Sequence, residues 1–62
     1  MRMMKSADII RELQAAGWFL DRVRGSPHVF KHPDRPGHGV VPHPKKDLGA
    51  GLVAAIRKQA GL

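Results

Sequence analysis

The chain has 62 residues and no Cys, and its eleven Lys and Arg outnumber five Asp and Glu, for a formal net charge of +6 at pH 7. So short a chain forms one domain with a thin core, spanning residues 1–62, and without Cys it can have neither disulfides nor thiolate chemistry. The positive excess favours an anionic partner, either a phosphate backbone or an acidic protein.

Nothing in the sequence indicates a membrane segment, a leader or a metal site. No run approaches the roughly 18 apolar residues of a membrane span, and the N-terminal residues 1–5 lack the apolar core of a signal peptide. The four histidines do not match the Cys-containing spacing of zinc sites. We therefore expect a cytoplasmic protein with no membrane partner, no metal and no cofactor.

The first predicted element is a helix over Ser6–Ala16. Ser6 is a favourable N-cap, and Asp8 falls in the first turn, where the helix dipole favours a negative charge. Apolar residues recur at helical spacing in this segment, at Ile9, Ile10, Leu13 and Ala16. Gly17 then ends a helix whose apolar stripe faces the core.

Two strands joined by a tight turn follow the helix. Residues 18–24 are rich in aromatic and β-branched side chains, and the turn Gly25-Ser26-Pro27 leads into a second strand over Val29–His32. Alternation along a strand divides the second segment between two faces, with His28, Phe30 and His32 on one and Val29 and Lys31 on the other.

The last third of the chain predicts a loop, a short strand and a second helix. Residues 33–39 are typical of a mobile loop, residues 40–42 of a short strand ended by Pro42, and residues 43–46 of an extended basic linker. Asp47 is the expected cap of the second helix and Gly61 its stop. Its expected inner stripe is Leu52, Ala55, Ile56 and Gln59/Ala60.

The element order is therefore α-β-β-β-α. A three-stranded antiparallel sheet with both helices on one face satisfies the layer rule for α+β domains and leaves the other face open. The open face, or its rim, is where we expect a ligand to meet the histidines and the cations of the first two strands, Arg22, Arg24 and Lys31.

His28 is the candidate catalytic residue. A histidine that directly follows a tight turn is held near the surface, where an imidazole can transfer protons near neutral pH. The alternative is that His28 only fills a strand position, since location alone does not identify a catalytic group. His32 and His43 precede prolines, which favours structural roles, although one of them can serve as a second acid/base group. His38, between two glycines, is interpreted as a bystander.

Several segments together resemble the HicA family, the mRNA interferase toxins of HicAB toxin–antitoxin modules. They are Gly25-Ser26-x-His28, Phe30-x-His32-Pro33, residues 41–48 (VPHPKKDL) and the ending Gln59-Ala60-Gly61-Leu62. The resemblance implies a fold like that of double-stranded-RNA-binding domains, metal-independent and ribosome-independent cleavage of mRNA by one histidine, and neutralisation by an antitoxin, HicB. Many members carry two adjacent histidines where this chain has Pro27-His28, so we assign the catalytic role to His28. If the essential residue aligns with Pro27 instead, the chain is a weakened or inactive nuclease.

Cations near His28 are the expected RNA contacts, because guanidinium and ammonium groups both suit phosphate. The predicted RNA-binding residues are Arg22, Arg24, Ser26, Lys31, Lys45 and Lys46. Each cation can instead be a solvated surface charge. The alternatives for the whole chain are a non-catalytic RNA-binding module of the same fold and a protein-interaction domain. The antitoxin is expected to be acidic and to cover His28, with Trp18 or Phe30 as apolar anchors.

Overall fold

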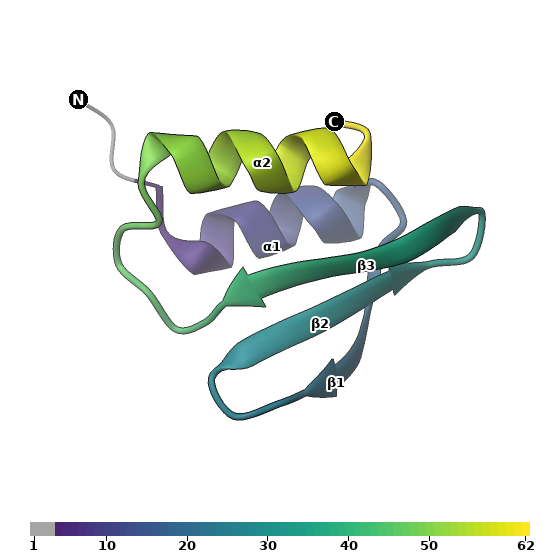
Figure 1. The fold of residues 1–62 in the computed structure, drawn as a ribbon, viewed down its shortest axis with the longest axis horizontal. Helices are drawn as coiled ribbons and strands as arrows, with labels where there is room; N and C mark the ends of the chain where they lie inside the picture. The colour runs from purple at the N-terminus through teal and green to yellow at the C-terminus, as the bar shows by residue number, and fades with distance from the viewer. Residues whose placement is uncertain (1–3) are drawn as a thin grey trace.

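The computed structural model describes residues 4–62, which form two helices and one three-stranded antiparallel sheet (Figure 1). In chain order the elements are α1 (Ser6–Ala15), β1 (Phe19–Val23), β2 (Pro27–His32), β3 (Arg35–Pro42) and α2 (Ala50–Ala60). The strands lie in the order β1-β2-β3, and both helices cover the same face of the sheet. The predicted α-β-β-β-α order and α+β class are confirmed, and the arrangement is consistent with the double-stranded-RNA-binding-domain fold. None of the helices within these residues is long and apolar enough to cross a membrane.

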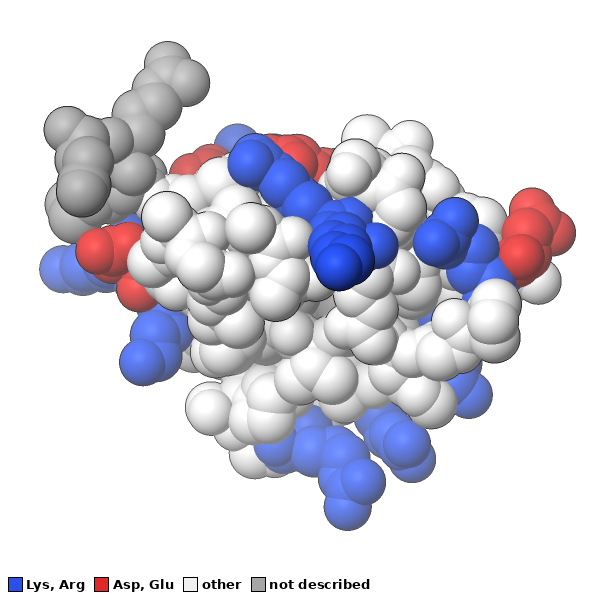
Figure 2. Space-filling model, turned by 45° about the horizontal axis from the view of Figure 1, so that its top comes forward, with Lys and Arg blue, Asp and Glu red and all other residues white. Residues whose placement is uncertain are grey.

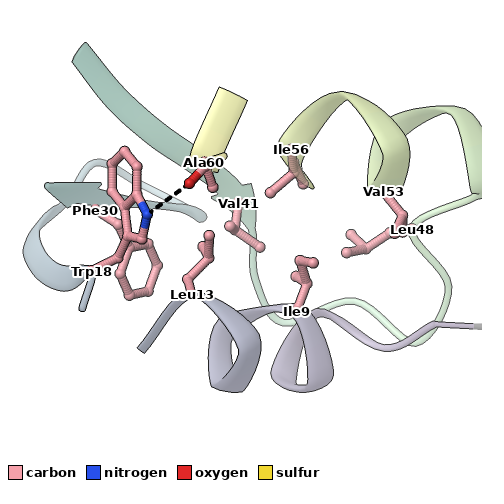
Figure 3. Packing of buried hydrophobic residues seen from close by; sticks show 9 residues of the cluster. All are labelled: Ile9, Leu13, Trp18, Phe30, Val41, Leu48, Val53, Ile56 and Ala60. Atoms are coloured by element: carbon pink, nitrogen blue, oxygen red, sulfur yellow. Dashed lines mark hydrogen bonds between the residues drawn. The ribbon is translucent and has the colours of Figure 1, made fainter. Parts of the chain in front are cut away.

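The core fills the space between the helices and the sheet (Figure 3). It consists of nine buried apolar side chains, Ile9, Leu13, Trp18, Phe30, Val41, Leu48, Val53, Ile56 and Ala60. The larger ones each stabilise the fold by about 1.5–3 kcal/mol through burial. The Trp18 indole Nε1–H also donates to the Ala60 carbonyl oxygen at 3.4 Å, which ties the end of α2 to the segment after α1. Because Trp18 and Phe30 are only 3% and 1% exposed, the prediction that they anchor an antitoxin is wrong.

Ser6 was predicted to cap α1, but it does not. It is the first residue of the helix, follows the N-cap residue Lys5, and is only 1% exposed. The Ser6 hydroxyl turns away from its own helix toward the segment after β3, where it bonds His43 and the Lys45 backbone. Asp8 serves the helix start instead, because its carboxylate accepts the Lys5 backbone N–H at 3.3 Å.

The inner face of α2 includes Ile56 and Ala60, as predicted, but differs from the prediction at the start of the helix. Val53, Ile56 and Ala60 are buried, whereas Leu52 and Ala55 are exposed. Adjacent apolar residues at 52 and 53 fit two helical phases, and packing against the core selects the one that buries Val53. The helix begins after Gly49, and the Asp47 carboxylate accepts the Gly49 N–H at 2.9 Å, so Asp47 supports the turn before the helix and does not cap it directly.

The expected mobile loop at residues 33–39 is mostly strand. The β2–β3 hairpin turns at Pro33 and Asp34, His32 pairs with Arg35, and β3 runs on to Pro42. Prolines and glycines indicate a loop in the sequence, but β3 is an edge strand, where the missing N–H of Pro36 leaves no ladder partner unpaired. Pro42 does end the strand, as predicted.

Candidate active site

Two histidines that lie fifteen positions apart in the sequence meet at one end of the sheet. His28 lies in the central strand β2, opposite Val23 of β1 and Val41 of β3, and His43 directly follows β3. Their rings make an edge-to-face contact with centroids 4.7 Å apart and an interplanar angle of 79°. Both side chains are half-buried. The fold therefore places two acid/base groups beside each other, within reach of a single bound group.

The His43 ring is held from the helix side by Ser6. Ser6 Oγ lies 2.7 Å from His43 Nδ1, accepts the Lys45 backbone N–H at 2.8 Å and lies 3.2 Å from the Lys45 carbonyl oxygen. The Ser6 N–H donates to that same carbonyl at 2.9 Å. These bonds fix the segment after β3 against the first turn of α1, although no spacing in the sequence connects the two.

The turn before β2 supports His28 through its backbone. His28 Nδ1 lies 3.4 Å from the Ser26 carbonyl oxygen, and the His43 backbone N–H donates to the same oxygen at 3.4 Å. Ser26 itself is exposed. Ser26 therefore contacts His28 through its main chain, and its predicted role in RNA binding stays a prediction.

His32 is used differently. Its Nε2–H donates to the Ala16 carbonyl oxygen at 2.9 Å, and its Nδ1 accepts the Asp34 N–H at 3.0 Å. The ring also lies edge-on to Trp18, with centroids 5.4 Å apart. With both nitrogens engaged, His32 closes the C-terminus of α1 and has no free position for proton transfer.

Two of the predicted RNA-binding cations lie on the opposite face of the sheet from His28. Arg22 pairs with Val29 and Lys31 with Phe19, so alternation places both on the face that the helices leave open. Both reach the Asp21 carboxylate, at 3.6 Å from Arg22 and 3.9 Å from Lys31. A bulge between Leu20 and Arg22 sets this register.

The other predicted cations lie at the His28 end of the sheet. Arg24 follows Val23, the strand partner of His28, and its N–H donates to the Pro27 carbonyl at 3.0 Å. Lys45 and Lys46 follow His43, and both are exposed. In Figure 2 the Lys and Arg side chains occupy several separate places, so the positive charge on this face is not gathered in a single patch.

Two hollows flank α1. A hollow of about 390 Å³ is lined by His43, Pro44, Lys5, Ser6, Ala7, Lys45 and Lys46. A second one, of about 530 Å³, lies between the starts of the two helices and is lined by Met4, Asp8, Asp47, Gly49, Ala50, Val53, Ala54 and Arg57. The first hollow is the one that matters for the site, because it contains a site histidine and three cations, whereas no histidine lines the larger one.

Within residues 4–62, no three His, Asp or Glu side chains lie close enough to hold a metal ion. Away from the histidines an ion pair joins the two helices, and its hydrogen bonds from Arg57 lower the pKa of Glu12. The candidate site therefore consists of two adjacent imidazoles, the main chain that orients them, and the nearby cations Arg24, Lys45 and Lys46.

The fold and this site define a small basic α+β domain with two imidazoles at the end of its sheet. The sequence profile of a family described as the HicA toxin of bacterial toxin-antitoxin systems matches residues 6–62. The chain therefore belongs to the HicA toxin family, which makes it the toxin of such a system and implies an antitoxin as its partner. No curated protein matches the chain in a sequence comparison.

Proposed function

We propose that the toxin is a metal-independent RNA endonuclease, an mRNA interferase, in which His28 is catalytic. The observation that supports it best is the half-buried His28 at the end of the central strand, in contact with a second imidazole and next to exposed cations. Membership of the HicA family agrees with this activity.

Cleavage of RNA without a metal uses the ribose 2′-hydroxyl as the nucleophile. A base removes the 2′-hydroxyl proton, the 2′-oxygen–phosphorus bond forms, the phosphorus–5′-oxygen bond breaks, and an acid supplies a proton to the leaving 5′-oxygen. The products are a 2′,3′-cyclic phosphate and a 5′-hydroxyl. His28 takes part in the proton transfer, and cations stabilise the charge that builds up on the phosphate oxygens.

Arg24, Lys45 and Lys46 are the proposed phosphate contacts nearest to His28, with Ser26 in the adjoining turn. Their side chains are exposed at the end of the sheet where the two histidines meet. Arg22 and Lys31 are proposed to act at longer range, through the positive field that attracts RNA, because they lie on the other face and share Asp21. The cellular substrate in this proposal is mRNA, met in the cytoplasm.

The antitoxin is proposed to be an acidic protein of the HicB type. A chain of net charge +6 attracts such a partner electrostatically, and complementary charge speeds association.

The test is incubation of the purified toxin with RNA in EDTA. A second substrate has the same base sequence but 2′-deoxyribose at every position. We expect cleavage of the first substrate only. His28→Ala should reduce cleavage by about 10²–10⁴-fold, the usual contribution of acid/base catalysis, without changing the melting temperature appreciably. His38→Ala is the matched control, since the His38 ring is also half-buried but lies in β3 away from this contact, and it should retain activity.

Two results would decide against the proposal. Full activity in a folded His28→Ala variant removes the catalytic assignment. Salt-sensitive RNA binding without any cleavage favours the alternative, a non-catalytic RNA-binding module of the same fold.

A further inference from the structure

We propose that His43 is a second catalytic residue, which donates a proton to the leaving 5′-oxygen while His28 accepts the proton of the 2′-hydroxyl. The inference rests on the proposed RNA endonuclease function. It goes beyond that function because it adds a second proton-transfer group and assigns the two roles.

His43 lies beside His28. His43 is the histidine whose ring contacts His28, with centroids 4.7 Å apart, and it comes from a different segment of the chain. His32 is committed to Ala16 and Asp34 at the other end of β2. Cleavage through the 2′-hydroxyl needs proton transfer on two sides of one phosphorus, and two adjacent imidazoles can reach both sides.

His43 Nδ1 lies within hydrogen-bond distance of the Ser6 hydroxyl. The Ser6 hydroxyl has one proton, and its oxygen already accepts the Lys45 N–H at 2.8 Å. When its proton is directed to the Lys45 carbonyl, 3.2 Å away, the oxygen accepts a second bond from His43 Nδ1–H at 2.7 Å. This arrangement retains a proton on Nδ1 in both charge states of the ring. Nε2, which makes no hydrogen bond within residues 4–62, is then the nitrogen that exchanges a proton with substrate.

His28 is in the complementary state. Its Nδ1 lies 3.4 Å from the Ser26 carbonyl, and a carbonyl oxygen can only accept, so the neutral ring carries its proton on Nδ1 there. The lone pair of His28 is then on Nε2, where it can take the 2′-hydroxyl proton. One ring thus presents an acceptor and the other, when protonated, a donor.

The surroundings of His43 suit a group that delivers a proton to an anionic substrate. Lys5, Lys45 and Lys46 line the same hollow, and none of the residues that line it is acidic. A phosphodiester is attracted to these cations, and the acid meets it as the 5′-oxygen leaves. After the step His43 is neutral and His28 is positively charged, so the total number of protons on the pair is unchanged.

The experiment compares two RNA substrates in EDTA, one natural and one with sulfur in place of the 5′-oxygen at the cleaved linkage. A 5′-thiolate leaves without protonation, so it removes the need for an acid but not for a base. On natural RNA, His43→Asn should lose about 10²–10⁴-fold in cleavage rate. On the sulfur substrate it should return to within about tenfold of wild type, whereas His28→Ala should remain inactive.

Asn is chosen because its side-chain amide can still donate to Ser6, which preserves the packing of the segment after β3. His43→Ala serves as a second variant, and thermal melting establishes that each variant is folded. The wild-type rate on natural RNA tests the endonuclease function by itself. If wild type cleaves and a folded His43→Asn protein cleaves natural RNA at the same rate, the role of His43 is overturned while the endonuclease stands. Loss of activity that the sulfur substrate does not restore likewise overturns its role as the acid.

Discussion

His32 Nε2 lies 2.9 Å from the carbonyl oxygen of Ala16, the C-cap residue that follows α1. Since a carbonyl only accepts and Nδ1 of the same ring accepts the Asp34 N–H, the ring is neutral with its proton on Nε2. The contact joins the end of the first helix to the β2–β3 turn. His32 thus holds the fold together at one end of β2, whereas His28 and His43 meet at the opposite end.

His32→Ala is therefore expected to destabilise the fold. It leaves the Ala16 carbonyl and the Asp34 N–H without their partners, which costs about 1–3 kcal/mol in the free energy of unfolding. In a domain of this size the melting temperature falls by about 4–8 °C per kcal/mol. Thermal melting followed by circular dichroism measures the change, with His38→Ala as the control. Equal melting temperatures for His32→Ala and wild type would show that water replaces the ring at no cost.

A side chain at Gly17 is expected to destabilise the fold. Its φ is +96°, and an added Cβ would lie 2.8 Å from His32 Nε2. Gly17→Ala should cost about 1–3 kcal/mol from the backbone conformation alone. Gly51→Ala is the matched control, because Gly51 lies in α2 with nothing within 4 Å of its added Cβ, and it should gain about 0.5–1 kcal/mol. In a double-mutant cycle, the destabilisation by Gly17→Ala and that by His32→Ala should be less than additive. His32→Ala removes the ring that the added Cβ of residue 17 would meet.

The two helices are joined by a bidentate ion pair, in which Arg57 donates to Glu12 Oε1 at 2.9 Å and to Oε2 at 2.7 Å. These hydrogen bonds lower the pKa of Glu12 from its ordinary value of 4.5, against smaller opposing effects of burial and of Asp8. A folded-state pKa below the unfolded one means that the pair stabilises the fold above the unfolded value. This stabilisation is lost as the pH falls through the lowered pKa.

Glu12→Gln should accordingly be less stable than wild type near pH 7, and the difference should shrink below pH 4.5. Urea unfolding at a series of pH values measures it. Arg57→Met should remove the same pH-dependent part of the stability, since it deletes the partner of Glu12. A difference between wild type and Glu12→Gln that stays constant from pH 7 to strongly acidic solution would contradict the assignment.

Local patterns predict most of the fold. The apolar spacing of α1 and the turn at Gly25-Ser26-Pro27 follow from rules that act within a few residues, and both are observed near their predicted positions. β3 is longer than predicted because an edge strand tolerates Pro36, and whether a strand is at an edge depends on sheet order. The phase of α2 also depends on its packing partners.

The site could be predicted only in part, because it too depends on contacts between segments that are distant in the sequence. The turn before His28 identifies that residue as a candidate, but its contact with His43 arises when the ends of two strands meet. Ser6 and His43 are separated by 37 positions, and their hydrogen bond has no counterpart in any local pattern. A serine at the start of a helix predicts a cap, and only the tertiary structure shows that its hydroxyl serves another segment.

RNA affinity should decrease with salt, and the cations near the histidines should contribute most to that dependence. For single strands each neutralised phosphate contributes about 0.7 to the slope of log K against log salt, so Lys45→Ala/Lys46→Ala should flatten the slope by about 1.4. The control is Arg22→Ala/Lys31→Ala, which removes the same charge from the opposite face, where both cations already share Asp21. Filter binding of an uncleavable 2′-deoxy analogue measures both slopes. Equal flattening by the two pairs would show that RNA does not distinguish the faces.

The antitoxin is expected to silence the toxin by covering the two histidines, without remodelling the fold. Val23 is a suitable apolar anchor, because it is 50% exposed and lies directly opposite His28. An acidic partner that packs on Val23 and pairs with Arg24 and the lysines after His43 would close the site to RNA. Amide exchange in the complex should then show added protection at residues 22–29 and 42–46, together with loss of nuclease activity.

Val23→Asp tests the anchor, since it places a negative charge where an acidic partner would dock. Affinity for the antitoxin should fall at least about tenfold, which corresponds to about 1.4 kcal/mol. Leu52→Asp is the matched control, because Leu52 is 40% exposed but lies on α2, away from the histidines. The affinity of this variant for the antitoxin should be unchanged. If Leu52→Asp weakens the complex more than Val23→Asp, and the exchange protection lies on α2, then the antitoxin binds the helix face. His28 would in that case remain open to solvent in the complex, and inhibition could not come from occlusion of the site.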